Sequence, residues 1–276
     1  MKFSERLGFK PVKEQLQVDS IDDELRNSLW SVYLEFFLQR VENWNHNPEL
    51  TRFARSLWYE FFKKPIDTLP IDDYGILDTN WLTKFLREYF YSDKRVWFEF
   101  YDILEFSASF GSQEFITVTN LILEKEKSAF RFVHGQLVQI TSKVEISEIE
   151  EAIRSSDKYK SVNTHLNEGL KMLADKEKPN YRNSIKESIS AVEAMCKIFT
   201  NNPKTTLGEA LNKLEKEHGL HPAMKKSFSS LYGYTSDEGG IRHALIEGDK
   251  EIDFYEAKFM LVTCSSFINF LISRQT

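Results

Sequence analysis

The sequence predicts a mainly α-helical protein with a small β-hairpin. Apolar residues in the long segments recur at three- and four-residue spacing, which is the period of one helix face. Only 11 Gly and 7 Pro interrupt the 276 residues. Apolar content is 41 % and charged content is 28 %, both ordinary for a globular protein. A chain of this length can form one large or two ordinary domains with a substantial core.

Residues 1–145 are expected to form an aromatic-rich helical domain. We expect a first helix over about 21–44 and a second that follows Asn47-Pro48 and runs to about Phe62. Further helices are expected over 78–106, with a break near Ser92, and over 112–127. All five Trp and 27 of the 38 aromatic residues precede residue 150. This enrichment favours a bulky core, because aromatic side chains dominate cores by buried area. The alternative is a surface on which bases or a partner stack.

The pattern changes from helical to nearly alternating at residues 130–141. Two short strands around His134-Gly135 make a plausible hairpin. A lone hairpin is marginally stable, so we expect it to lie on a helical surface or to pair elsewhere. The Glu-rich residues 146–156 then predict a short solvated helix that links two domains.

Residues 157–276 are expected to form an antiparallel helix bundle. Amphipathic stretches follow one another with short connections, and Pro179, Pro203 and Gly219 end three of them. Asp253 with Glu256 three residues later predicts a capping box at the start of the last helix.

The charge distribution excludes a long basic track for nucleic acid. From residue 157 onward there are 17 Lys and Arg against 16 Asp and Glu, whereas the whole chain has 36 against 42. The first part therefore carries the negative excess. If RNA is the substrate, it must be held locally or across an oligomer that pools positive patches.

Cysteine usage and hydropathy predict a soluble cytoplasmic protein. Cys196 and Cys264 lie within apolar helical patterns, so we expect two buried thiols rather than a disulfide. The first residues lack the apolar region of a signal peptide. The most apolar run, residues 259–272, is too short and too polar to span a bilayer, and no membrane partner is expected.

The stretch from Tyr232 to Glu247 gathers the residues best suited to chemistry. Two glycines at 239 and 240 permit a sharp turn, and Arg242 and His243 follow where a helix is able to begin. A guanidinium, an imidazole that titrates near neutrality and free amides together suit a bound phosphate. The hypothesis is a site that handles a phosphodiester.

The alternative is a helix start at which Arg242 pairs with Asp237 or Glu238 on the surface. Two further residues are candidates for supporting roles. Arg182 opens a helix and is either a second phosphate contact or a surface cation, and Glu193 either orients Arg242 or lies at the surface.

No metal and no cofactor are expected. Glu215, Glu217, His218 and His221 straddle a helix end rather than sharing one rigid face. Phosphate-loop, dinucleotide, zinc-finger and nucleophile-elbow patterns are absent from the sequence.

Two stretches of the C-terminal half resemble the HEPN superfamily of helical domains. They are Tyr181-Arg-Asn-Ser-Ile-Lys-Glu-Ser-Ile-Ser-Ala-Val-Glu-Ala and Gly240-Ile-Arg-His-Ala. About 130 residues at the start, opening with Phe3-Ser-Glu-Arg-Leu-Gly-Phe, resemble an N-terminal domain that accompanies HEPN in AbiJ-like bacterial abortive-infection proteins.

The resemblance implies an activity. Many HEPN proteins are metal-independent endoribonucleases, usually dimers whose active site forms where two copies of a motif meet. That motif is an Arg, commonly followed by a polar residue, with a His five to seven positions after the Arg. Arg242 and His243 match its opening, whereas Glu247, Gly248 and Asp249 occupy the window of the second His.

The resemblance therefore implies a homodimeric ribonuclease effector of phage defence, with RNA as its substrate and an antitoxin or a phage-derived trigger as a further partner. In this hypothesis the N-terminal domain senses a signal or restrains the effector, and His243 takes the acid–base role. Two alternatives stay open. One is a dimeric HEPN scaffold that binds RNA or nucleotide without cutting it, and the other is a helical regulatory protein in which the Arg–His pair is structural.

Overall fold

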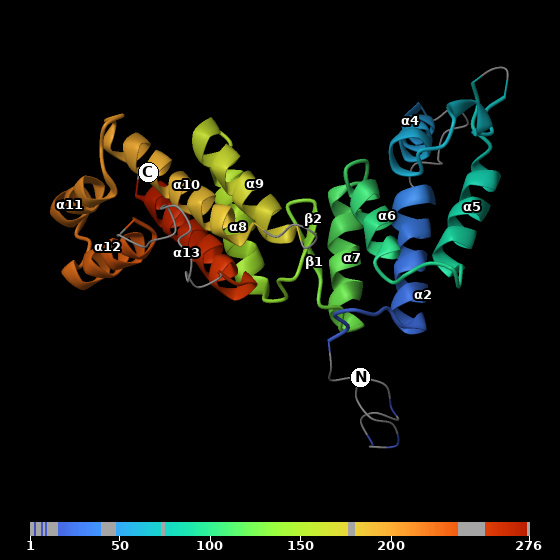
Figure 1. Cartoon of the computed structure of the whole chain (residues 1–276), viewed down its shortest axis with the longest axis horizontal. Coiled ribbons are helices and arrows are strands. Elements are labelled where there is room, and N and C mark those ends of the chain that lie inside the picture. Colours follow the sequence, from blue (N-terminus) through green and yellow to red (C-terminus); the bar gives the residue numbers. More distant parts are fainter. Residues whose placement is uncertain are drawn as a thin grey trace, which may run out of the picture. The chain divides into compact units, whose positions relative to one another are not determined.

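The chain forms two compact units, residues 1–141 and residues 142–276 (Figure 1). The computed structural model describes residues 3, 7, 9, 16–39, 48–72, 75–175, 180–236 and 252–274. The predicted mainly helical class is confirmed, because helices make up most of the described chain and the strands form a single two-stranded hairpin there.

Three helices of the first unit begin where the sequence supplies a capping side chain. Asp22, Asp78 and Ser112 each accept a hydrogen bond from the backbone N–H three residues later. The elements are α2 (Asp23–Val32), the π-helical η1 (Tyr33–Leu38), α4 (Pro48–Ser56), the π-helical η2 (Leu57–Phe61), the 3-10 turn η3 (Ile66–Thr68), α5 (Thr79–Tyr91), α6 (Glu99–Ala108) and α7 (Gln113–Lys125).

The core of the first unit is made largely of aromatic rings. Phe90 is fully buried and its ring lies 5.2 Å from that of Trp30, 5.3 Å from that of Tyr33 and 5.9 Å from that of Phe100, measured between centroids. The hydroxyls of Tyr33 and Ser107 share a buried hydrogen bond of 2.8 Å. Burial raises the pKa of Tyr33, and the bond to Ser107 opposes part of that rise. The aromatic enrichment therefore serves a core, as favoured from the sequence.

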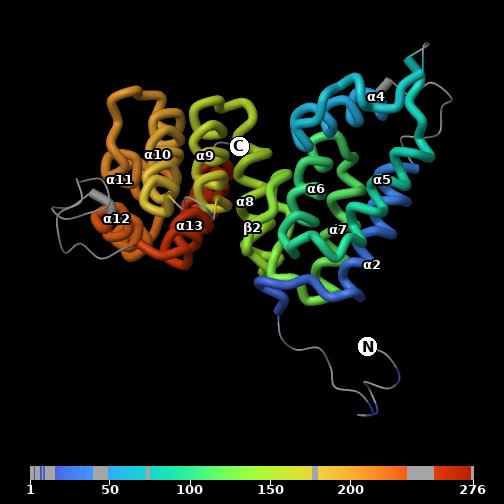
Figure 2. The backbone as a smooth tube through the Cα atoms, turned by 45° about the vertical axis from the view of Figure 1, so that its right-hand side comes forward, coloured from blue at the N-terminus to red at the C-terminus, as the bar shows by residue number. Residues whose placement is uncertain are grey.

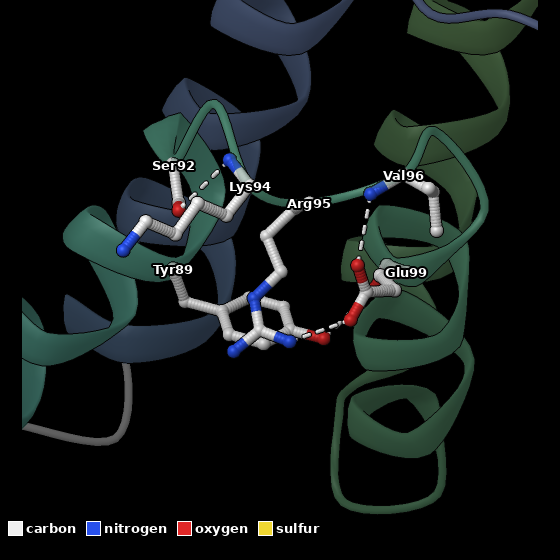
Figure 3. A network of polar contacts seen from close by, with 6 residues as sticks. All are labelled: Tyr89, Ser92, Lys94, Arg95, Val96 and Glu99. Carbon is white, nitrogen blue, oxygen red and sulfur yellow. Dashed lines mark hydrogen bonds and ion pairs between the residues drawn. The ribbon is translucent and has the colours of Figure 1, made fainter.

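The predicted break near Ser92 is confirmed, and a polar network holds the connection between α5 and α6 (Figure 3). The guanidinium of Arg95 lies 4.3 Å from the ring centroid of Tyr89 and donates to Oε1 of Glu99 at 2.5 Å. The other carboxylate oxygen of Glu99 accepts from the N–H of Val96 at 2.9 Å. One carboxylate thus fixes both the start of α6 and the cation that covers the tyrosine ring.

The hairpin predicted at residues 130–141 is present as β1 (Arg131–Val133) and β2 (Gln136–Val138), with Phe132 opposite Leu137. His134 and Gly135 form the turn with φ of 47° and 81°, as a two-residue primed turn requires. Helical side chains hold its outer edges. Asn120 of α7 accepts from the N–H of Phe132 and donates to its carbonyl, while Glu105 of α6 accepts from the N–H of Leu137 at 2.6 Å.

The second unit is a helical bundle with α10 at its centre. Its elements are α8 (Lys143–Ser155), α9 (Lys160–Ala174), α10 (Tyr181–Thr200), α11 (Leu207–His218), α12 (Pro222–Ser236) and α13 (Phe254–Ser273). The helix α8 lies where the sequence predicted a linker helix over 146–156, and it packs against α13 within this unit. The domain limits at 145 and 157 stay predictions.

Small side chains bring α9 and α10 close together. The carbonyl of Gly169 accepts a hydrogen bond from Ser184 at 2.7 Å, and a Cβ at Gly169 would lie 3.3 Å from the hydroxyl of Ser188. In contrast to this antiparallel pair, which lies side by side in Figure 2, α10 and α13 run in the same direction. Tyr181 and Phe254, each the first residue of its helix, contact one another with ring centroids 6.1 Å apart.

Two local predictions for the second unit are confirmed. Asp253 and Glu256 form the capping box of α13, in which the N–H of Glu256 donates to Asp253 at 2.8 Å. Cys196 and Cys264 are buried free thiols. Among the described helices, none is both long and apolar enough to cross a bilayer.

Candidate functional site

The helix α10 carries two of the supporting residues that the sequence predicted. Arg182 and Glu193 are half-buried and eleven residues apart. On a helix this spacing puts them on nearly the same face but about 16 Å apart along the axis. The structure therefore does not bring these two side chains into one local cluster.

Glu193 has a partner that the sequence analysis did not assign. The hydroxyl of Tyr232 on α12 donates to Oε1 of Glu193 at 2.7 Å, in a partly buried contact. Burial raises the pKa of the Cys196 thiol to about 12, and the negative charge of Glu193 one turn away adds to this rise. The bond ties the last turns of α12 to the middle of α10.

Arg182 lies in the first turn of α10. Asn180 caps α10 by accepting from the N–H of Asn183 at 3.3 Å, and Tyr181 contacts Phe254 at the start of α13. Arg182 is half-buried. Because the neighbouring Tyr181 contacts Phe254, Arg182 lies near the residue at which α13 begins.

These contacts locate both flanks of the segment that holds the predicted catalytic pair. Tyr232 precedes that segment and is fixed at Glu193, whereas Phe254 follows it and is fixed at Tyr181. The two anchor points on α10 are about 18 Å apart along its axis. The remaining predicted site residues lie outside the described part of the chain, and they are Asp237, Glu238, Arg242, His243 and Glu247.

An apolar cavity of about 20 Å³ lies beside the bond between Tyr232 and Glu193. Helices α10, α11, α12 and α13 contribute its lining, which is Ile189, Val192, Leu207, Phe228, Leu231, Tyr232, Thr263, Cys264 and Phe267. None of these side chains is charged at neutral pH, and the cavity lies where α12 packs against its neighbours.

Several other His and Glu side chains of the second unit contact side chains of neighbouring helices. Nδ1 of His165 lies 2.6 Å from a carboxylate oxygen of Glu187, which links α9 to α10. Glu215 pairs with Lys225 at 2.6 Å, and the ring of His218 lies 5.2 Å from that of Phe199. In the described residues, no three His, Cys, Asp or Glu side chains gather in a way that would hold a metal ion.

Tyr232 is the residue that sequence reasoning missed. It follows Phe228 by four positions, so it continues the apolar stripe of α12, and its hydroxyl is a polar group at the end of that stripe. A buried or half-buried tyrosine hydroxyl usually finds a hydrogen-bond partner. This signal points to a polar residue on the neighbouring helix without identifying Glu193.

Together these features define a mainly helical protein of two units, of which the first is an aromatic helical domain with a hairpin. The family described as AbiJ N-terminal domain 4 matches residues 1–155, more than half of the chain. The chain therefore belongs to this family, and the resemblance of its first half to an AbiJ-like domain is confirmed. The match indicates a component of an abortive-infection system. No curated protein and no solved structure matches the chain.

Proposed function

We propose that this protein is a HEPN-type endoribonuclease effector of abortive infection that cleaves RNA without a metal ion. Membership of the AbiJ N-terminal domain 4 family supports the biological setting. The HEPN-like stretch 181–194 forms most of α10, which contacts α9, α11, α12 and α13. The observation that carries the proposal is that contacts at Tyr181 and Glu193 of this helix fix both flanks of the segment holding Arg242 and His243.

In the proposed reaction, a base takes the proton from the 2′-hydroxyl of RNA. The resulting oxygen attacks the neighbouring phosphorus, the bond to the 5′-oxygen breaks, and a cyclic phosphate is left. Only RNA has this hydroxyl, so DNA is not a substrate. His243 acts as general base or acid, since an unperturbed imidazole has a pKa of about 6.5. Arg242 stabilises the charge that gathers on the phosphoryl oxygens.

The supporting residues act on the two flanks. Glu193 holds the end of α12 through Tyr232, which limits the positions open to the chain after that helix. Arg182 supplies a second cation beside the start of α13 and serves as an additional phosphate contact. A two-fold dimer would bring a second Arg242 and His243 to the same RNA, so that base and acid come from different chains.

A second candidate function is supported by one feature of the sequence. Glu247, Gly248 and Asp249 stand where HEPN ribonucleases have their second His. A site with a single imidazole per chain suits a dimeric module that binds RNA or nucleotide without cutting it. A phage-derived trigger or an antitoxin would then be the partner through which it acts.

Cleavage of RNA in excess chelator tests the proposal directly. We expect the purified chain to cut RNA in the presence of EDTA and to leave cyclic phosphate ends. Arg242→Ala should lower the cleavage rate by about 10²- to 10³-fold, as expected for loss of one donor to a developing oxyanion. His243→Ala should lower it by about 10²- to 10⁴-fold, as expected for loss of a general acid or base.

Matched controls are available elsewhere in the second unit. Arg274→Ala and His218→Ala remove the same residue types at positions that contact Phe270 and Phe199, and we expect both to keep full activity. Unchanged cleavage by Arg242→Ala and His243→Ala would show that these residues are not catalytic. RNA binding without cleavage would favour the second candidate. A strict monomer in sedimentation at micromolar concentration would contradict the shared site.

A further inference from the structure

The helix α12 is attached to the second unit differently from the other helices. None of the side chains described in α12, residues 222–234, is buried. By contrast, α8, α9, α10, α11 and α13 each bury at least three side chains. Segments with few buried apolar contacts are those that open locally at the lowest free energy.

The described contacts that join α12 to its neighbours include three that lie along one narrow stripe. Lys225 pairs with Glu215 of α11 at 2.6 Å, and both side chains are about 30 % exposed. Phe228 stacks on Phe267 of α13 with ring centroids 3.9 Å apart. Tyr232 donates to Glu193 of α10. An ion pair this exposed contributes little, so we expect the stacked ring pair to contribute most among these three contacts.

Packing under α12 is incomplete. Phe228, Leu231 and Tyr232 line the cavity of about 20 Å³ together with residues of α10, α11 and α13. Side chains that face a void lose the dispersion contacts that a filled core would give. Cys264 lines this cavity and is buried, whereas Cys196 is buried on α10 and does not line it.

We propose that α12 is a detachable helix, which leaves the second unit as one segment while the rest of the bundle stays folded. Detachment breaks the contacts at Lys225, Phe228 and Tyr232 and exposes the apolar groove between α10 and α13. The thiol of Cys264 becomes accessible in that state. Cys196 becomes accessible only when the whole unit unfolds.

Labelling with a disulfide reagent such as Ellman's reagent tests this, because each thiol can be followed alone. The 276-residue chain with Cys196→Ala retains only Cys264, and the chain with Cys264→Ala retains only Cys196. Burial raises the pKa of both thiols to about 12, so their folded states are similarly unreactive. We expect Cys264 to be labelled at least tenfold faster in native buffer.

Shortening the Phe228 side chain should change the labelling rate of Cys264 but not that of Cys196. Phe228→Ala should speed labelling of Cys264 by tenfold or more and leave that of Cys196 within a factor of about two. Tyr232→Phe removes only the hydroxyl and should speed labelling of Cys264 by about two- to tenfold, as expected for one net hydrogen bond. Met224→Ala shortens an exposed side chain of the same helix and should change neither rate.

The urea dependence gives an independent measure. Labelling of Cys264 should depend weakly on urea because detachment of one helix exposes little surface, and that of Cys196 should depend steeply. The proposal is wrong if both thiols respond equally to Phe228→Ala and to urea, or if Tyr232→Phe has no effect on Cys264. Any consequence of detachment for RNA cleavage rests on the proposed function, whereas thiol labelling does not, so the two fail separately.

Discussion

The two units pack their helices with different side chains. In the first, large rings separate the helices, and Phe90 contacts the rings of Trp30, Tyr33 and Phe100. In the second, Gly169 and Ser184 let α9 approach α10 closely, and aliphatic residues of α10 and α13 fill the core. Rings of fixed shape specify distances through their size, whereas small residues specify them through close approach. The helix α12 of the second unit has no buried side chain among residues 222–234.

The same division separates two experimental signals. All five Trp precede residue 142, and both cysteines follow it. Tryptophan fluorescence therefore reports on the first unit and thiol chemistry on the second, while far-UV circular dichroism reports on both. The stability of each unit can thus be perturbed and followed separately.

The largest effect is expected in the aromatic core. Phe90→Ala removes a fully buried ring and should lower the free energy of unfolding of the first unit by about 3–5 kcal/mol. Urea unfolding followed by tryptophan fluorescence measures this loss. Tyr59→Ala is the matched control, because its ring is 67 % exposed and its loss should change stability by no more than about 0.5 kcal/mol. A cost below about 1 kcal/mol for Phe90→Ala would contradict the importance of the ring cluster.

Alkaline pH should destabilise the second unit first. Burial raises the pKa of Cys196 and Cys264 from 9.0 to about 12. Between pH 9.0 and about pH 12, the thiols keep their protons in the folded chain but lose them in the unfolded chain. Their contribution to the free energy of unfolding is therefore fully present below pH 9 and decreases as the pH rises. The loss is at most about 1.4 kcal/mol per pH unit for each thiol. Burial also raises the pKa of Tyr89 and Tyr101 from 10.0 to about 12, so the first unit responds later.

Urea unfolding is measured at about pH 8, 9.5 and 10.5. As the pH rises, the urea midpoint should decrease at a lower pH when it is followed by circular dichroism than when it is followed by tryptophan fluorescence. Replacing both cysteines by Ala should remove the difference between the two signals. If the fluorescence midpoint falls first, or if the double variant keeps the same pH dependence, the thiols are not responsible.

A smaller effect should distinguish two helical glycines. A Cβ at Gly169 of α9 would lie within 3.3–3.6 Å of three atoms of α10, so Gly169→Leu should lower stability by about 1–3 kcal/mol through overpacking. Gly208 of α11 is exposed, and its nearest neighbour would be 4.0 Å away. Gly208→Leu should therefore be neutral or slightly stabilising, because Leu has the better helix propensity. Equal effects of the two substitutions would argue against a close approach of α9 and α10.

Local signals in the sequence predicted much of the fold. The break near Ser92, the turn at His134-Gly135 and the capping box at Asp253 depend on neighbouring residues, and all three are confirmed. The role of Asn120 at the hairpin depends on the partner that tertiary packing supplies, and no spacing rule contains it.

The candidate site was less predictable for the same reason. The sequence identified Glu193 as a candidate supporting residue, but its bond to Tyr232 joins residues 39 positions apart. The absence of buried side chains among the described residues of α12 was equally hidden, since Phe228 and Leu231 follow the same apolar spacing as residues of buried helices. Arg242 and His243 lie outside the described residues and stay predictions.

The way the hairpin edges are held has a consequence for aggregation. An exposed strand edge is a template on which another chain can add a strand. In β1 the N–H and carbonyl of Phe132 are both used by the amide of Asn120, and in β2 the N–H of Leu137 is used by Glu105. A second hairpin would have to displace these side chains before it could pair. The β-ribbon is thereby protected against intermolecular strand addition, even though it has only two strands.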